Sequence, residues 1–227
     1  MHARLLSNES ATPTTRRIRL TLNGAPFFYR PGQAASLAAD SPPTPYSIAS
    51  APGETRRYGW VEFLIKVDGS NRFGAVVERL GPGAAIDLQG PVGDFTLERA
   101  PGGAPLLFIA GGTGIAPLRS MIREAVDSRR PGPLALVYSN RSPEEFAYLD
   151  ELRALAATHG LMLSLTLTGS AEDWTHARGR AGISHLAELV QPDTTAFICG
   201  PPAMVSDVPA ALAALGVPPD RIVTESW

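Results

Sequence analysis

Residues 106–117 read LLFIAGGTGIAP, an apolar run that passes directly into a glycine-rich loop. An apolar run of this length bounded by glycines is typical of a buried strand. The following residues, 118–126, read LRSMIREAV and carry apolar side chains at helical spacing, which predicts an amphipathic helix. Strand, glycine loop and helix in this order aim backbone N–H groups and a helix dipole at one point, which suits a pyrophosphate.

The loop alone does not decide between a ligand site and an ordinary turn. Its spacing departs from the G-x-G-x-x-G dinucleotide fingerprint. Glycine turns between a strand and a helix are also common without a ligand. The interpretation therefore depends on the rest of the chain.

Composition restricts the class of protein. The chain has 227 residues, 44% hydrophobic content and a net charge of −2, which indicates a globular protein of one or two domains and argues against a nucleic-acid partner. The single cysteine, Cys199, excludes an internal disulfide and an iron–sulfur cluster held by four thiolates. The four histidines lack metal-ligand spacing, so we expect no metal site. No apolar stretch is long enough for a membrane span or a signal peptide, which predicts a cytoplasmic location.

The pattern of elements changes near residue 100. In residues 1–99, short β-like runs such as 17–22, 60–67 and 85–89 alternate with Pro/Gly turns, which favours an antiparallel barrel or sandwich. Beyond a linker at 99–105, alternating strands and helices predict a doubly wound parallel sheet. The expected strands lie near 106–110, 134–139, 161–167, 196–199 and 222–224, and the expected helices near 117–127, 145–158, 183–190 and 202–214. We predict two domains, 1–99 and 100–227.

Four further motifs accompany the glycine loop. Residues 197–204, FICGPPAM, place a second glycine turn at a strand end, and carboxyl ends of parallel strands bind ligands in a shared crevice. The first half contains YRPGQ at 29–33, TPYSIAS at 44–50 and GPVGDF at 90–95. The two glycine turns are therefore expected to face the same crevice.

These five motifs, in this order, resemble the ferredoxin–NADP reductase superfamily of flavoproteins over residues 28–204. The resemblance implies an N-terminal flavin-binding antiparallel β-barrel, followed by a five-stranded doubly wound α/β domain that binds NAD(P). It implies an oxidoreductase that accepts hydride from NAD(P)H on FAD. Electrons then pass to a separate redox protein, which would be a ferredoxin, a flavodoxin or an oxygenase component.

The resemblance also assigns roles to individual residues. Ser47 matches a serine near flavin N5, and Cys199 matches a cysteine near nicotinamide C4 that shapes geometry and is not a nucleophile. Glu225 matches an acidic residue of the active site two positions before a terminal aromatic, here Trp227, which stacks on the flavin. The residues implied in cofactor binding are Thr44, Pro45, Tyr46, Ser47, Gly74, Gly111, Gly112, Thr113, Gly114, Arg141, Cys199, Gly200, Pro201 and Trp227.

Each assignment has a plain structural alternative. Tyr46 and Cys199 would then be core residues, the helix expected over 73–80 around Gly74 a surface helix, and Trp227 a frayed terminus.

One position departs from the family pattern. The flavin motif of the superfamily begins with arginine, R-x-Y-S, where this chain has Thr44. Loss of one charge-assisted phosphate contact of this kind costs about 1.5–3 kcal/mol, or roughly 10- to 150-fold in affinity. Arg72 or Arg56 are candidates to replace the charge. We therefore expect weaker flavin binding than in typical relatives.

The choice between NAD and NADP stays open in the sequence. Arg141, after the second strand of the parallel sheet, is placed to pair with a 2′-phosphate. Residues 168–169 read TG where NADP-using relatives often have Ser-Arg, and Arg178 or Arg180 are possible substitutes.

Two other functions compete with the electron-transfer reductase. One is an NAD(P)H:flavin oxidoreductase that uses free flavin as substrate, which Thr44 favours. The other is a regulatory nucleotide-binding module without activity, against which the intact Tyr46, Ser47, Thr113 and Cys199 argue.

Overall fold

The computed structural model describes residues 1–70 and 72–226, and within them the chain forms two sheets of different kinds. The first is antiparallel with strand order β4-β3-β6-β1-β2-β5. Its strands are β1 (His2–Thr12), β2 (Thr15–Thr21), β3 (Ala34–Ala38), β4 (Thr44–Ser47), β5 (Trp60–Lys66) and β6 (Ala85–Val92), with helices α1 (Pro52–Tyr58) and α2 (Arg72–Val77) between them.

This sheet closes into the predicted barrel. Ile48, directly after β4, forms an antiparallel bridge with Phe63 of β5, so the two ends of the strand order meet. Alternation in β2 sends Ile18 and Leu20 inward, where they pair with Phe63 and Val61. The barrel core is thus a single cluster of buried aliphatic and aromatic side chains.

The second sheet is parallel, in the order β10-β9-β8-β7-β11-β12. Its strands are β7 (Leu106–Gly111), β8 (Leu134–Asn140), β9 (Met162–Leu167), β10 (Ala177–Arg178), β11 (Thr195–Gly200) and β12 (Ile222–Ser226), and its helices are α3 (Ile115–Asp127), α4 (Leu149–His159), α5 (Ile183–Leu186) and α6 (Pro202–Ala214). All five predicted parallel strands are present. The two-residue β10 adds an edge strand that the sequence did not indicate.

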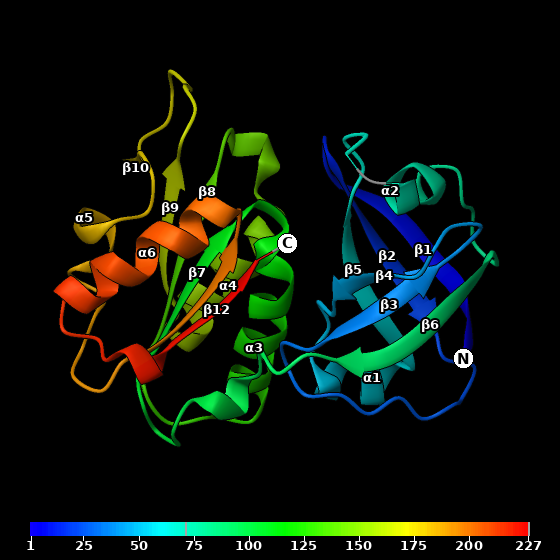
Figure 1. Cartoon of the computed structure of the whole chain (residues 1–227), viewed down its shortest axis with the longest axis horizontal. Coiled ribbons are helices and arrows are strands. Elements are labelled where there is room, and N and C mark those ends of the chain that lie inside the picture. Colours follow the sequence, from blue (N-terminus) through cyan, green and yellow to red (C-terminus); the bar gives the residue numbers. More distant parts are fainter. Residues whose placement is uncertain (71, 227) are drawn as a thin grey trace.

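Helices cover both faces of the parallel sheet. Figure 1 shows α3 on the side turned toward the barrel and α6 on the far side. On the near side, Ala49 and Leu64 of the barrel share one hydrophobic cluster with Leu118 and Met121 of α3. The barrel therefore packs directly against the helix that follows the glycine loop. None of the helices within 1–70 and 72–226 has the length and apolar character that a membrane crossing requires.

Candidate functional site

The two glycine turns meet at the point where the strand order reverses. β7 and β11 are neighbours there, and a further strand lies on the outer side of each. A Cβ on Gly114 would lie 2.1 Å from the carbonyl oxygen of Cys199, and one on Gly111 would lie 2.7 Å from Pro201 Cδ. Both positions therefore require glycine. The turns form one structure at the switch point, where open α/β sheets bind ligands.

The other side of the glycine loop is open. Gly112 has φ +55°, and a Cβ there would meet only the side-chain oxygen of Asn140, at 4.0 Å. Residues 112–114 form a 3-10 turn that leads into α3, and no side chain within the described residues caps this turn or the helix. The amide nitrogen of Asn140 is buried close by and has no hydrogen-bond partner among those residues. An uncapped helix start beside an unsatisfied amide fits a bound pyrophosphate and ribose.

Thr113, in the middle of this turn, is partly exposed. The hydroxyl of Tyr138 on β8 donates to the carbonyl of Gly112 at 3.1 Å, which anchors the loop to the neighbouring strand. Burial raises the pKa of Tyr138 well above its usual range, so this phenol keeps its proton. The loop is consequently fixed on one side and accessible on the other.

On the barrel, residues 44–47 of the flavin motif form strand β4. Ser47 is buried opposite Ala34 of β3, while Tyr46 is half-buried with its ring 5.2 Å from that of Phe73 at the start of α2. Burial raises the pKa of Tyr46 to about 12, so its hydroxyl is neutral at physiological pH. The partly exposed ring of Tyr46, together with its neutral hydroxyl, fits a planar heteroaromatic ligand.

Gln33 joins three of the five motifs. Its side-chain nitrogen donates to the carbonyl of Gly93 at 2.8 Å, and its own carbonyl accepts from the N–H of Ile48 at 2.9 Å. Its side-chain oxygen accepts from the N–H of Arg30 at 2.9 Å. The sequence singled out the P-G-Q motif but gave Gln33 no role. Its function in holding the motifs together is visible only in the structure, because Gln33 and Gly93 are 60 residues apart in sequence.

The C-terminal strand brings an acidic residue, Glu225, close to Gly93 and Cys199. Glu225 of β12 lies in register with Cys199 of β11. A Cβ on Gly93 would lie 4.0 Å from a carboxylate oxygen of Glu225. Cys199 itself is fully buried, on the face of the sheet that turns toward α3. Thus Gly93, Cys199 and Glu225 come together from three motifs, while Trp227 lies outside the described residues.

The remaining predicted residues lie in two groups, one on each sheet. Thr44 donates its hydroxyl to the carbonyl of Pro42 at 3.2 Å, and Pro45 is exposed beside it. Gly74 is buried on α2, two residues after Arg72, and Gly200 is buried next to the exposed Pro201. The flavin-side and nucleotide-side predictions thus lie on the barrel and the parallel sheet respectively.

The arginines considered for a 2′-phosphate differ in their surroundings. Arg141 is exposed, and its carbonyl packs against Gly169, where a Cβ would lie 2.2 Å away. Arg178 donates to the carbonyl of Ala171 at 2.6 Å, whereas Arg180 is 3.9 Å from Asp207 on α6. Arg141 is therefore the one whose loop adjoins residues 168–169 directly.

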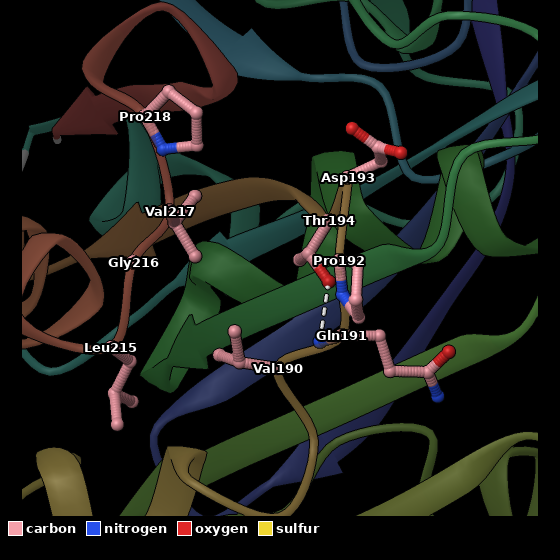
Figure 2. A pocket seen from close by; sticks show the side chains of 9 residues that line it. All are labelled: Val190, Gln191, Pro192, Asp193, Thr194, Leu215, Gly216, Val217 and Pro218. Carbon is pink, nitrogen blue, oxygen red and sulfur yellow. Dashed lines mark hydrogen bonds between the residues drawn. The ribbon is translucent and has the colours of Figure 1, made fainter.

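A hollow of about 260 Å³ lies among the loops of the parallel-sheet half of the chain, away from the glycine turns (Figure 2). It is lined by residues 190–194 and 215–218, and the hydroxyl of Thr194 accepts from the N–H of Gln191 across part of it. These residues precede β11 and β12, so the hollow is at the amino end of the strands, opposite the glycine turns. In the described part of the chain, no group of three or more acidic, histidine or cysteine residues is arranged to hold a metal ion.

Comparison with known proteins gives consistent relatives. A family model described as "Oxidoreductase NAD-binding domain" matches residues 108–209. Ferredoxin–NADP reductase B of Sorangium cellulosum is 33% identical over 99% of this chain and 96% of its own length. The ferredoxin–NAD(P)(+) reductase component of the naphthalene 1,2-dioxygenase system of Pseudomonas putida is 32% identical over 96% of this chain, which spans 66% of that relative.

Among solved structures, a ferredoxin NADP+ reductase from Neisseria gonorrhoeae with bound FAD and NADP has a TM-score of 0.83. The match covers 100% of this chain and 98% of that one at 23% sequence identity. At this identity the likeness concerns the fold, which is the same arrangement of barrel and parallel sheet.

Proposed function

Since the chain belongs to the ferredoxin–NADP reductase family of NAD(P)H-dependent flavin oxidoreductases, we propose that it takes hydride from NAD(P)H and supplies electrons to a separate redox protein. The acceptor is a ferredoxin, a flavodoxin or an oxygenase component. Relatives that serve an oxygenase system support the last of these, although the chain spans about two thirds of their length. With one cysteine, these 227 residues hold no four-thiolate cluster, so the one-electron carrier is another protein or another region.

The observation that carries the proposal is the meeting of the barrel motifs and the glycine turns. Gln33 joins Gly93 to Ile48, and Gly93 in turn lies beside Glu225, in register with Cys199. FAD would be held by residues 44–47 and 74, and the nicotinamide nucleotide by residues 111–114, 141 and 199–201. When bound, FAD supplies the hydride-accepting and electron-releasing chemistry.

The protein residues position these groups and handle protons. The hydroxyl of Ser47, buried at the end of β4, donates or accepts a hydrogen bond as the adjacent group changes its protonation. Tyr46 offers a ring face and a neutral phenol. Cys199 is fully buried, so it shapes the nicotinamide site through its packing and through its backbone beside Gly114, and Glu225 exchanges protons with solvent at the edge of the site. We also propose that Trp227 stacks on the flavin.

A second function draws support from a specific feature. Thr44 stands where relatives of this family carry arginine, and its hydroxyl is bonded within its own loop, to the carbonyl of Pro42. Reduced flavin affinity would make the chain an NAD(P)H:flavin oxidoreductase, with flavin as substrate. Arg72 offers a replacement charge because it precedes Phe73, whose ring contacts Tyr46. Arg56, on α1, is exposed as well.

The organisation proposed for the chain is a flavin domain over 1–99 and an NAD(P) domain over 100–227. Expressing each part alone and measuring binding of FAD and of NAD(P)H to each tests this division. A cytoplasmic location belongs to the same proposal and is tested by fractionating cells that produce the chain.

The first experiment is the visible spectrum of the purified protein, followed by anaerobic addition of NADH or NADPH. Stoichiometric flavin that bleaches promptly with one nucleotide supports the reductase and identifies the nucleotide. A colourless protein that oxidises NAD(P)H only with added flavin supports the flavin oxidoreductase. Absence of oxidation with every acceptor would favour a binding module without activity.

A further inference from the structure

Arg119 of α3 is buried at the boundary between the barrel and the parallel sheet, 5% exposed. One guanidinium nitrogen donates to the carbonyl of Ala49 at 2.8 Å and to Glu54 at 3.0 Å. The second donates to the other oxygen of Glu54 at 3.0 Å, and Nε donates to Glu151 of α4 at 2.9 Å. One side chain thus binds a backbone group and a carboxylate of the barrel, and a carboxylate of its own sheet.

We propose that Arg119 is a positioning residue for hydride transfer, which sets the separation between the flavin motif and the glycine loop. This inference rests on the function proposed above. Ala49 is two residues after Ser47, and Arg119 is five residues after Gly114. These intervals span about 7 Å of extended chain and about 7.5 Å of helix. A short, stiff path therefore connects the two motifs through a single guanidinium.

The barrel end of this connection is itself fixed. The carboxylate of Glu54 accepts a hydrogen bond from the N–H of Ala51 at 2.8 Å, so it caps the start of α1 while it holds Arg119. A second hydrogen bond crosses the boundary beside it, since Ser120 donates to the carbonyl of Ser50 at 2.7 Å. Residues 49 and 50 are thus tied to α3 through their two consecutive carbonyls.

Apolar contact alone does not supply this precision. Ala49 and Phe95 of the first half pack in one cluster with Ile115 and Met121, and this burial holds the two sheets together through a non-directional force. A guanidinium presents donors in a rigid fork, so it binds a carboxylate and a carbonyl only in one relative orientation. Lysine keeps the charge but lacks the fork, which makes Arg119→Lys the informative substitution.

The experiment uses the full chain loaded with FAD. For Arg119→Lys and Arg119→Met we expect kcat with NAD(P)H to fall roughly 100-fold, the loss associated with a displacement of about 1 Å at a reacting centre. The KM for NAD(P)H and the affinity for FAD should stay unchanged, and the deuterium isotope effect with NAD(P)D should rise because the hydride step becomes limiting. In the apoprotein, backbone amides of residues 49–55 should exchange hydrogen faster.

Arg123→Met is the matched control. Arg123 is one turn further along α3, and its Nε lies 3.9 Å from Glu54 and 3.7 Å from Glu151, so its removal alters the same charge cluster. We expect wild-type kcat from it. Ser120→Ala removes the neighbouring bond to Ser50 and should lower kcat in the same direction as Arg119→Lys, to a smaller extent. This variant decides the question if the Arg119 variants do not fold.

A folded Arg119→Lys protein with wild-type turnover per bound flavin would overturn the inference, even if its melting temperature fell, since a purely stabilising role predicts that pattern. Equal losses of kcat in Arg119→Lys and Arg123→Met would overturn it too. If the wild type does not oxidise NAD(P)H, the proposed function fails. Hydrogen exchange in the apoprotein still tests the connection itself.

Discussion

Substitution of Gly114 by alanine tests whether the two glycine turns act as one structure. An ideal Cβ at this position would lie 2.1 Å from the carbonyl oxygen of Cys199 and 2.9 Å from the nitrogen of Gly200. Ordinary contact begins near 3.4 Å, about 1.3 Å more than the space available. Both neighbours are backbone atoms, so no side-chain rotation relieves the clash, and the end of β11 has to move away from the start of α3.

The expected effects follow from that displacement. Overpacking of this kind costs about 3 kcal/mol, at the upper end of the usual range, because backbone must shift. For a chain of this length the melting temperature should fall by roughly 6–12 °C. A displacement near 1 Å at a reacting centre lowers turnover by roughly 100-fold. The FAD content should stay unchanged, because the flavin motif lies on the barrel.

The assay is NAD(P)H oxidation per bound flavin, together with thermal unfolding. Gly102→Ala is the matched control, because a Cβ there meets nothing within 4 Å, and it should leave both measurements unchanged. Gly112→Ala separates strain from clash. It has space for a Cβ, but its φ of +55° makes alanine less favourable by roughly 1–2 kcal/mol. If Gly114→Ala keeps wild-type turnover, or loses FAD while retaining nucleotide binding, the reasoning is refuted.

Three further predictions concern the barrel side. Thr44→Arg should tighten FAD binding roughly 10- to 150-fold by restoring a phosphate contact, measured by titrating the apoprotein; no gain would count against weak flavin binding through Thr44. Ser47→Ala should retain FAD and lower kcat roughly 5- to 150-fold, and wild-type kcat would exclude a role for this hydroxyl in the hydride step. Burial raises the pKa of Glu54, but the charge and hydrogen bonds of Arg119 outweigh it and hold the pKa below its usual value of 4.5. The stabilisation of the fold by the Glu54 carboxylate is therefore present above about pH 4.5 and is lost as pH falls through the lower, folded-state pKa. The difference in melting temperature between wild type and Glu54→Gln should accordingly shrink on acidification. A constant difference would refute this.

The sequence predicts the parallel sheet well because its signals are local. The strand, loop and helix over 106–127 are confirmed, and so is the barrel, which contains the strands predicted at 17–22, from its polar and apolar alternation, and at 60–67. The helix expected over 145–158 begins later, at Leu149. Pro143–Glu145 forms a separate 3-10 turn, and Tyr148 adopts φ +61°, which interrupts a continuous helix. The helix expected over 183–190 is shorter in the structure and ends at Leu186.

Two elements of the barrel lacked a usable signal. β1 reads HARLLSNESAT, whose second half is polar, and it forms through pairing with β2 and β6 and not through its own pattern. α1 begins at Pro52 after Ala51, a weak capping residue, and Glu54 supplies the cap from inside the helix. In both cases partners distant in sequence, or a side chain inside the element, decide the structure.

The motifs predict which residues gather, but not the distances between them. Gln33 reaches Gly93 across 60 residues, and Arg119 reaches Ala49 across 70. No local pattern marks such pairs, because an arginine on a helix or a glutamine after a turn is ordinarily solvated. Hydride transfer, however, depends on separation to within an ångström. Arg119, which lies outside the five motifs, is therefore a residue whose substitution should alter turnover without altering the composition of the ligand-binding motifs.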